Sequence, residues 1–77
     1  MTTEQFYRSL EEVIEADKGT LLGTEQLNDL KGWDSLAILG FIAMADSKLG
    51  AAVPAKAIVE CETIQDLKRL LGENIKD

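Results

Sequence analysis

The segment SLAILGFIAMADSKL, residues 35–49, carries the strongest helix signal in this chain. Asp34 or Ser35 can cap its start, and Gly50 follows it as a residue suited to end a helix. At about 100° per residue, one apolar stripe should face a hydrophobic core. That stripe consists of Ile38, Phe41, Ile42, Ala45 and Leu49. The opposite, outward face should contain Leu36, Gly40, Ala43 and Ser47. The pattern predicts a helix over residues 35–49 that packs through one side.

Three further helices are predicted around this segment. Residues 3–17 repeat apolar side chains at helical spacing, and Thr2 with Gln5 forms a capping-box pattern before them. Residues 55–60 fit a short helix that Pro54 introduces. Residues 64–71 fit a final helix capped by Thr63.

The connection over residues 18–33 has no periodicity, yet it is too apolar for a free linker. Its apolar residues are Leu21, Leu22, Leu27, Leu30 and Trp33. We expect an ordered loop held to the core by these side chains, with one helical turn around residues 24–27. No segment of the sequence shows the alternating apolar pattern of a β-strand. The expected fold is all-α: a small four-helix bundle, with three longer helices, one short third helix and a long ordered loop between the first two.

Length and composition limit the classes of function. With 77 residues the chain is one domain, residues 1–77, and a single cysteine with no histidine leaves no intramolecular disulfide and no ordinary zinc or histidine-based site. The net charge of −6 opposes binding to nucleic acid or to an anionic membrane. No apolar run is long enough to span a bilayer, and the first residues do not form a signal peptide. We therefore expect a soluble, cytoplasmic protein.

Catalytic and metal-binding motifs are not apparent. The glycines form neither a dinucleotide-binding nor a P-loop pattern, and no acidic run has calcium-loop spacing. Glu11, Glu12 and Glu15 are expected on the solvated face of the first helix, and Cys61 is expected as a small buried apolar residue. We predict no metal site and no enzymatic activity.

One position is suited to carry a phosphoester. Ser35 lies at a predicted helix start, where unpaired backbone N–H groups and the helix dipole favour a negative group. By position alone, however, Ser35 is also an ordinary residue of a helix cap.

A wider sequence pattern around Ser35 suggests a function for this residue. Asp34-Ser35-Leu36 resembles the D-S-L signature of acyl carrier proteins and related phosphopantetheine-carrying domains. The order of parts is similar as well: a long loop, the signature, an apolar-striped helix, Val53-Pro54 before a third helix, and a capped final helix over residues 63–71. The resemblance covers nearly the whole chain.

This resemblance implies a carrier that is itself no enzyme. A phosphopantetheinyl transferase would use Mg²⁺ and coenzyme A to attach phosphopantetheine to the Ser35 hydroxyl, which makes the chain a phosphoprotein. The thiol of this cofactor would hold an acyl or aminoacyl group as a thioester, as in fatty acid or polyketide biosynthesis. Asp34 would help the transferase bind metal, and Leu36 would fill an apolar socket on a partner. Acyl-loading and acyl-processing enzymes would be the other partners of a monomeric protein.

The chain departs from fatty-acid carriers in its charges. Residues 34–61 contain Asp34, Asp46 and Glu60 against Lys48 and Lys56, so the acidic docking surface of that family is largely missing. We expect partner recognition through a mainly apolar face made of Asp34, Leu36, Ala37, Gly40, Ala43, Met44 and Asp46. This favours a specialised pathway with a polyketide, a modified lipid, or an amino or hydroxy acid as cargo. One alternative is a helical adaptor without a prosthetic group, whose Leu36-Gly40-Ala43 face would pack against a partner helix. The other is a metal-sensing bundle, which the absence of metal-ligand spacing disfavours.

Overall fold

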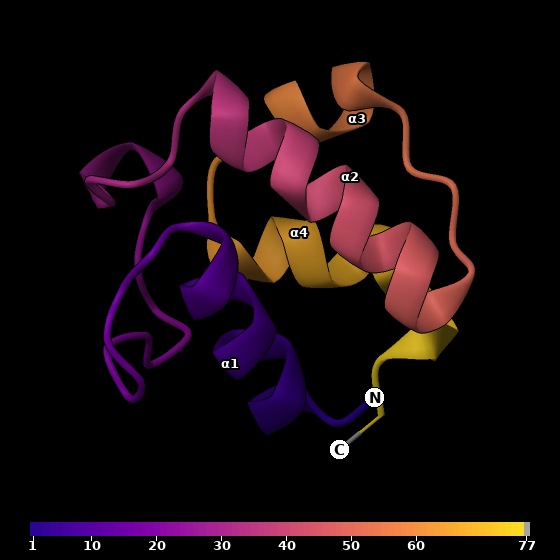
Figure 1. Ribbon diagram of the computed structural model, residues 1–77, viewed down its shortest axis with the longest axis horizontal. Coiled ribbons are helices and arrows are strands. Elements are labelled where there is room, and N and C mark those ends of the chain that lie inside the picture. The colour runs from indigo at the N-terminus through magenta and orange to yellow at the C-terminus, as the bar shows by residue number, and fades with distance from the viewer. Residues whose placement is uncertain (77) are drawn as a thin grey trace.

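The computed structural model describes residues 1–76 and contains helices joined by ordered loops (Figure 1). The elements are α1 (Thr3–Val13), the 3₁₀ turn η1 (Leu27–Asp29), α2 (Ser35–Leu49), α3 (Ala55–Val59), α4 (Ile64–Leu71) and the 3₁₀ turn η2 (Gly72–Asn74). Within the described residues no strand forms; an isolated bridge pairs Gln26 with Thr63. The all-α prediction, with a short third helix, is confirmed.

Local hydrogen bonds explain where three of the helices begin. The Thr2 hydroxyl accepts a bond from the Gln5 amide at 3.1 Å, and the Gln5 side chain accepts one from the Thr2 amide at 2.9 Å. Thr63 and Asp66 form the same reciprocal pair before α4. At α2, Asp34 Oδ1 accepts a bond from the Ala37 amide at 2.9 Å. Each cap satisfies N–H groups that the first helical turn leaves unpaired.

The first helix is shorter than the predicted 3–17 because a left-handed residue ends it. Glu15 has φ +59°, and the amides of Glu15 and Ala16 donate backward to the carbonyls of Glu12 and Glu11, at 3.2 and 2.8 Å. This is the Schellman pattern, which usually uses glycine at the left-handed position. Because the sequence has glutamate at this position, the local pattern does not mark the end of the helix, and the prediction extends the helix to residue 17.

The core joins all four helices through large apolar side chains. In Figure 1, α2 crosses the molecule with α1 on one side and α3 on the other. Phe41 of α2 makes edge contacts with Phe6 and with Trp33, each with ring centroids 6.4 Å apart. The fully buried apolar residues include Phe6, Leu10, Leu21, Leu27, Phe41, Ile58, Ile64 and Leu67.

The rotation of α2 about its axis differs from the predicted one. Its buried residues are Ala37, Phe41, Met44 and Ala45. Ile38, Ile42 and Leu49, expected at the centre of the stripe, are only partly buried. Because α2 is apolar on most of its sides, its pattern does not determine which side faces the core.

The long loop before α2 is ordered and packs Leu21 and Leu27 into the core, as predicted, and a buried carboxylate also holds it. Glu11 is only 2% exposed, so its expected place on a solvated face is wrong. It accepts hydrogen bonds from the amides of Gly19 and Leu21, the latter at 2.8 Å, and pairs with Arg8. Leu22 points outward, with 75% of its surface exposed.

The loop also contacts the start of α4. The Leu27 amide donates to the Glu62 carbonyl at 2.9 Å. The helical turn expected over residues 24–27 occurs later, as η1. The loop is therefore fixed at its start by Glu11 and near its middle by this bond, before the chain enters α2.

Candidate functional site

Ser35 is the first residue of α2, and its side chain is exposed. The capping bond comes from Asp34 instead, so the Ser35 hydroxyl makes no hydrogen bond within residues 1–76. The backbone amides of Ser35 and Leu36 also have no acceptor in that part of the chain. An exposed hydroxyl therefore lies beside two unpaired N–H groups at the positive end of the helix dipole.

The residues just before Ser35 hold this helix start against the rest of the molecule. A Cβ on Gly32 would collide with the Ile14 carbonyl oxygen, so only glycine allows the loop to pack on the end of α1. Trp33 then packs its ring against Phe41. The GW pair before Asp34 thus positions the helix start, a role that the sequence analysis did not assign.

Two exposed leucines follow Ser35 in the first turns of α2. Leu36 is 74% exposed and Leu39 is 62% exposed. We call this pair the leucine ridge. The predicted partner-recognition face includes Leu36 but not Leu39, although the spacing of three residues places both on one side of a helix. Ala43 and Asp46, also expected in a partner-binding face, are exposed further along α2.

Three residues of the expected partner-recognition face do not point to solvent. Ala37 and Met44 are 3% and 7% exposed, so both belong to the core. Gly40 faces α1, since a Cβ there would lie 3.4 Å from Val13 Cγ1. All three errors have one cause, the rotation of α2 that its sequence leaves open.

Two grooves flank the leucine ridge, and Leu39 lines both. The α1–α2 groove has a volume of about 530 Å³ and is lined by Glu12, Val13, Ile14, Glu15, Gly32, Asp34, Leu36, Ala37, Leu39 and Gly40. The α2–α3 groove has a volume of about 470 Å³ and is lined by Leu39, Ile42, Ala43, Asp46, Ala51, Ala52, Val53 and Pro54. Asp34 and Leu36 are the residues before and after Ser35 in the chain. Of these two grooves, they line only the α1–α2 groove.

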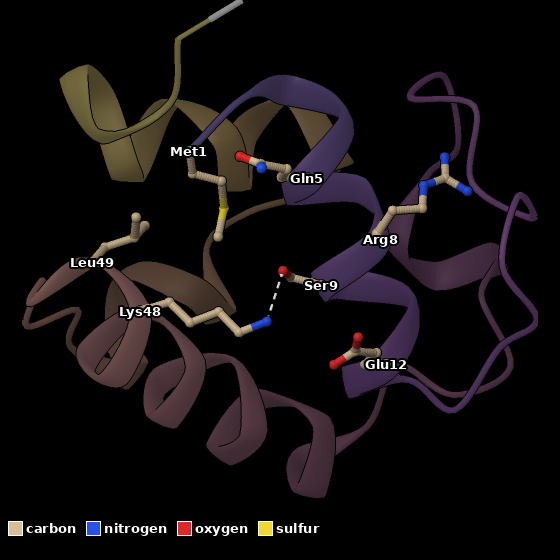
Figure 2. Close-up of a pocket in the computed structure, with 7 residues that line it drawn as sticks. All are labelled: Met1, Gln5, Arg8, Ser9, Glu12, Lys48 and Leu49. Carbon is tan, nitrogen blue, oxygen red and sulfur yellow. Dashed lines mark hydrogen bonds between the residues drawn. The ribbon is translucent and has the colours of Figure 1, made fainter.

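Ser9 lies in a third pocket, formed by α1 and the far end of α2 (Figure 2). Its side chain is 5% exposed, and Lys48 Nζ donates to its hydroxyl at 3.2 Å. Ser9 therefore lacks the free, exposed hydroxyl that Ser35 has.

The single cysteine has the features of a packing residue. Cys61 is half-buried, and its Sγ donates to the Ala57 carbonyl at 3.4 Å. Burial, with smaller contributions from Asp66 and Glu60, raises the pKa of the Cys61 thiol. A raised thiol pKa lowers the thiolate fraction and hence the reactivity.

Other kinds of site receive no support from the described residues. Over residues 1–76 no group of three His, Cys, Asp or Glu side chains is placed to hold a metal ion. No helix in that range has the length and apolar character needed to cross a bilayer.

The start of α2 is chemically suited to a covalently attached phosphate. Ser35 Oγ supplies the ester oxygen, and the two unpaired amides supply donors for phosphate oxygens. The Asp34 carboxylate is turned to the Ala37 amide, where it serves the cap. The residues present fit a phosphodiester at this position.

Comparison with known proteins identifies a family. A family model described as a phosphopantetheine attachment site matches residues 4–71, from the first turn of α1 to the end of α4. No curated protein and no solved structure matches the chain. Members of the matched family bind phosphopantetheine covalently. The chain therefore belongs to the acyl carrier protein family of phosphopantetheine-carrying domains.

Proposed function

We propose that Ser35 is the attachment residue and that the chain carries an acyl or aminoacyl group as a thioester on its phosphopantetheine arm. The observation that carries this proposal is the free, exposed Ser35 hydroxyl at the start of α2, inside the range that the family model matches. When bound, the arm supplies a flexible thiol that moves its cargo between enzymes. The chain itself catalyses no reaction in this proposal.

The attachment step would use the Ser35 oxygen as nucleophile in the active site of a phosphopantetheinyl transferase with Mg²⁺. A bond forms between Ser35 Oγ and the phosphorus that bears pantetheine in coenzyme A. The pyrophosphate bond breaks, adenosine bisphosphate leaves, and the hydroxyl proton passes to a base of the transferase. The unpaired amides of Ser35 and Leu36 favour the negative product at this helix start.

We further propose that partner enzymes contact the leucine ridge together with Asp34, Ala43 and Asp46. These residues are exposed and share α2 with Ser35. The acids of α2 and α3 are few, so this recognition is mainly apolar, and it supports dedicated partners in a specialised pathway. The proposal includes a monomeric, cytoplasmic protein that meets a transferase and acyl-loading and acyl-processing enzymes.

Intact-mass measurement tests the attachment residue. The chain is incubated with coenzyme A, Mg²⁺ and a promiscuous transferase. Wild type should gain one phosphopantetheine group and Ser35→Ala none, with equal helical circular dichroism. Ser47→Ala is the matched control, because Ser47 is an exposed serine of the same helix, and it should be modified like wild type.

Two results would contradict the proposal. Modification that persists in Ser35→Ala would place the arm on another residue. Absence of modification in folded wild type would favour the adaptor alternative.

A further inference from the structure

The α1–α2 groove lies where the tip of an arm on Ser35 can return to the protein. Asp34 and Leu36, on either side of Ser35 in the chain, line it. A covalently tethered group has a high effective concentration at such a site, so weak contacts suffice to hold it. The volume of about 530 Å³ is enough for a small acyl group.

A glycine in the middle of α2 keeps this groove open. Gly40 has an ordinary helical backbone, and a Cβ on it would make only ordinary contact with Val13, at 3.4 Å. The packing therefore does not require glycine, although alanine is the better residue inside a helix. The side chain missing at Gly40 leaves space between α1 and α2, in the groove that Asp34 and Leu36 also line.

The charges in the groove all have one sign. Glu12, Glu15 and Asp34 line it, and none of its lining residues is basic. The carboxylates of Glu12 and Glu15 have no hydrogen-bond or ion-pair partner within residues 1–76. In Figure 2 the Arg8 side chain points away from Glu12, and it pairs with Glu11. Lys48 donates to the neutral Ser9 hydroxyl and, in the described part of the chain, forms no ion pair with Glu12.

We propose that the α1–α2 groove receives the acyl end of the loaded arm and that the cargo carries an ammonium group, as an aminoacyl thioester does. The inference rests on the proposed attachment at Ser35. The apolar walls, including Val13 and Leu39, contact the carbon chain, while Glu12 and Glu15 attract the ammonium group. The α2–α3 groove contains a single acid, Asp46, and its lining is otherwise apolar, so it offers less to a cation.

Two cargoes of equal shape test this inference. The transferase loads the isotope-labelled chain from β-alanyl-coenzyme A or from butyryl-coenzyme A, which differ by an ammonium in place of a methyl group. Amide resonances of Val13, Gly32 and Gly40 report on the α1–α2 groove, and those of Ala51 and Val53 report on the α2–α3 groove. The β-alanyl group should shift the first set about 1.4- to 5-fold more than the butyryl group does, which is the range of one solvent-exposed ion pair.

Matched variants distinguish the effect of the groove's carboxylate charges from the effect of the space at Gly40. Glu12→Gln with Glu15→Gln should remove the difference between the cargoes. Glu4→Gln with Glu73→Gln makes the same change in net charge away from the groove and should preserve the difference. Gly40→Val should abolish the shifts, because its side chain fills the groove. If the valine variant does not fold, Gly40→Ala replaces it in the test and should reduce the shifts.

The failures are distinguishable. A chain that gains no mass from either thioester overturns the proposed function, and this inference with it. A chain loaded on Ser35 overturns the inference alone in three cases. The two cargoes give equal shifts, the shifts occur at Ala51 and Val53 instead, or the difference between the cargoes survives Glu12→Gln with Glu15→Gln.

Discussion

The two sides of α2 differ in what they offer to a group near Ser35. On the α1 side, Glu12 and Glu15 bring carboxylates from the end of the preceding helix to an apolar groove. On the α3 side, Ala51, Val53 and Pro54 come from a short connection that brings no charge. The leucine ridge separates the two sides and is exposed above both. One helix thus presents an acidic groove and an apolar groove, because different segments pack against its flanks.

The largest effect on stability is expected at Phe41, which packs α2 into the core. Phe41 is fully buried and contacts Phe6 of α1 and Trp33 of the loop. Phe41→Ala should lower the free energy of unfolding by about 3–5 kcal/mol, measured by urea denaturation. Leu39→Ala, on the exposed ridge, should change it by less than about 0.5 kcal/mol. Similar losses in the two variants would show that Phe41 does not support α2.

A smaller loss is expected when only the α1 side is disturbed. Glu11 holds the loop amides of Gly19 and Leu21 beside α1. Glu11→Gln removes a charge-assisted acceptor and leaves Arg8 without its partner, so unfolding should require about 2 kcal/mol less. Glu12→Gln, one residue away and exposed, is the control and should have almost no effect on the urea midpoint. An unchanged midpoint in Glu11→Gln would mean that its hydrogen bonds do not stabilise the loop.

The next prediction concerns the glycine that opens the acidic groove. Gly40→Ala should raise the free energy of unfolding by about 0.5–1 kcal/mol, because alanine is preferred inside a helix and its Cβ fits beside Val13. Gly50→Ala should do the opposite, since Gly50 has φ +63° at the end of α2. Thermal denaturation of both variants measures the contrast. A loss of stability in Gly40→Ala would show that packing, rather than the groove, requires glycine.

The smallest effect is expected at low pH, and it concerns the loop and α4 rather than α2. Loss of solvation raises the pKa of Glu25, but hydrogen bonds from the amides of Leu22 and Gly23 outweigh it and lower that pKa. A hydrogen bond from the Glu62 amide, with others at the α4 cap, lowers the pKa of Asp66.

Both carboxyl groups bind protons less readily in the folded chain than in the unfolded chain. Their stabilising contribution is therefore complete above the unfolded pKa, near 4, and is lost as the pH falls through the folded values. The urea midpoint should decline between about pH 5 and pH 2, and less steeply in Glu25→Gln with Asp66→Asn. An equal decline in that variant would assign the acid sensitivity to other carboxylates.

The features that sequence reasoning predicted correctly depend on neighbours along the chain. The ends of α2 follow from Asp34 and Gly50, and the start of α4 follows from Thr63, because caps and left-handed turns use hydrogen bonds only a few residues apart. The membership of the carrier family follows from the order of such local parts, and the family model confirms it over residues 4–71.

Three features were decided by the tertiary structure alone. The rotation of α2 buried Ala37 and Met44, because a helix that is apolar on most sides takes its orientation from the surfaces it meets. Glu11 became buried because the loop that follows α1 folds back and brings the amides of Gly19 and Leu21, which satisfy its charge. Glu15 and Gly40 line one groove only because α1 ends early and packs against α2. Such juxtapositions depend on contacts between segments, and no local sequence pattern encodes them.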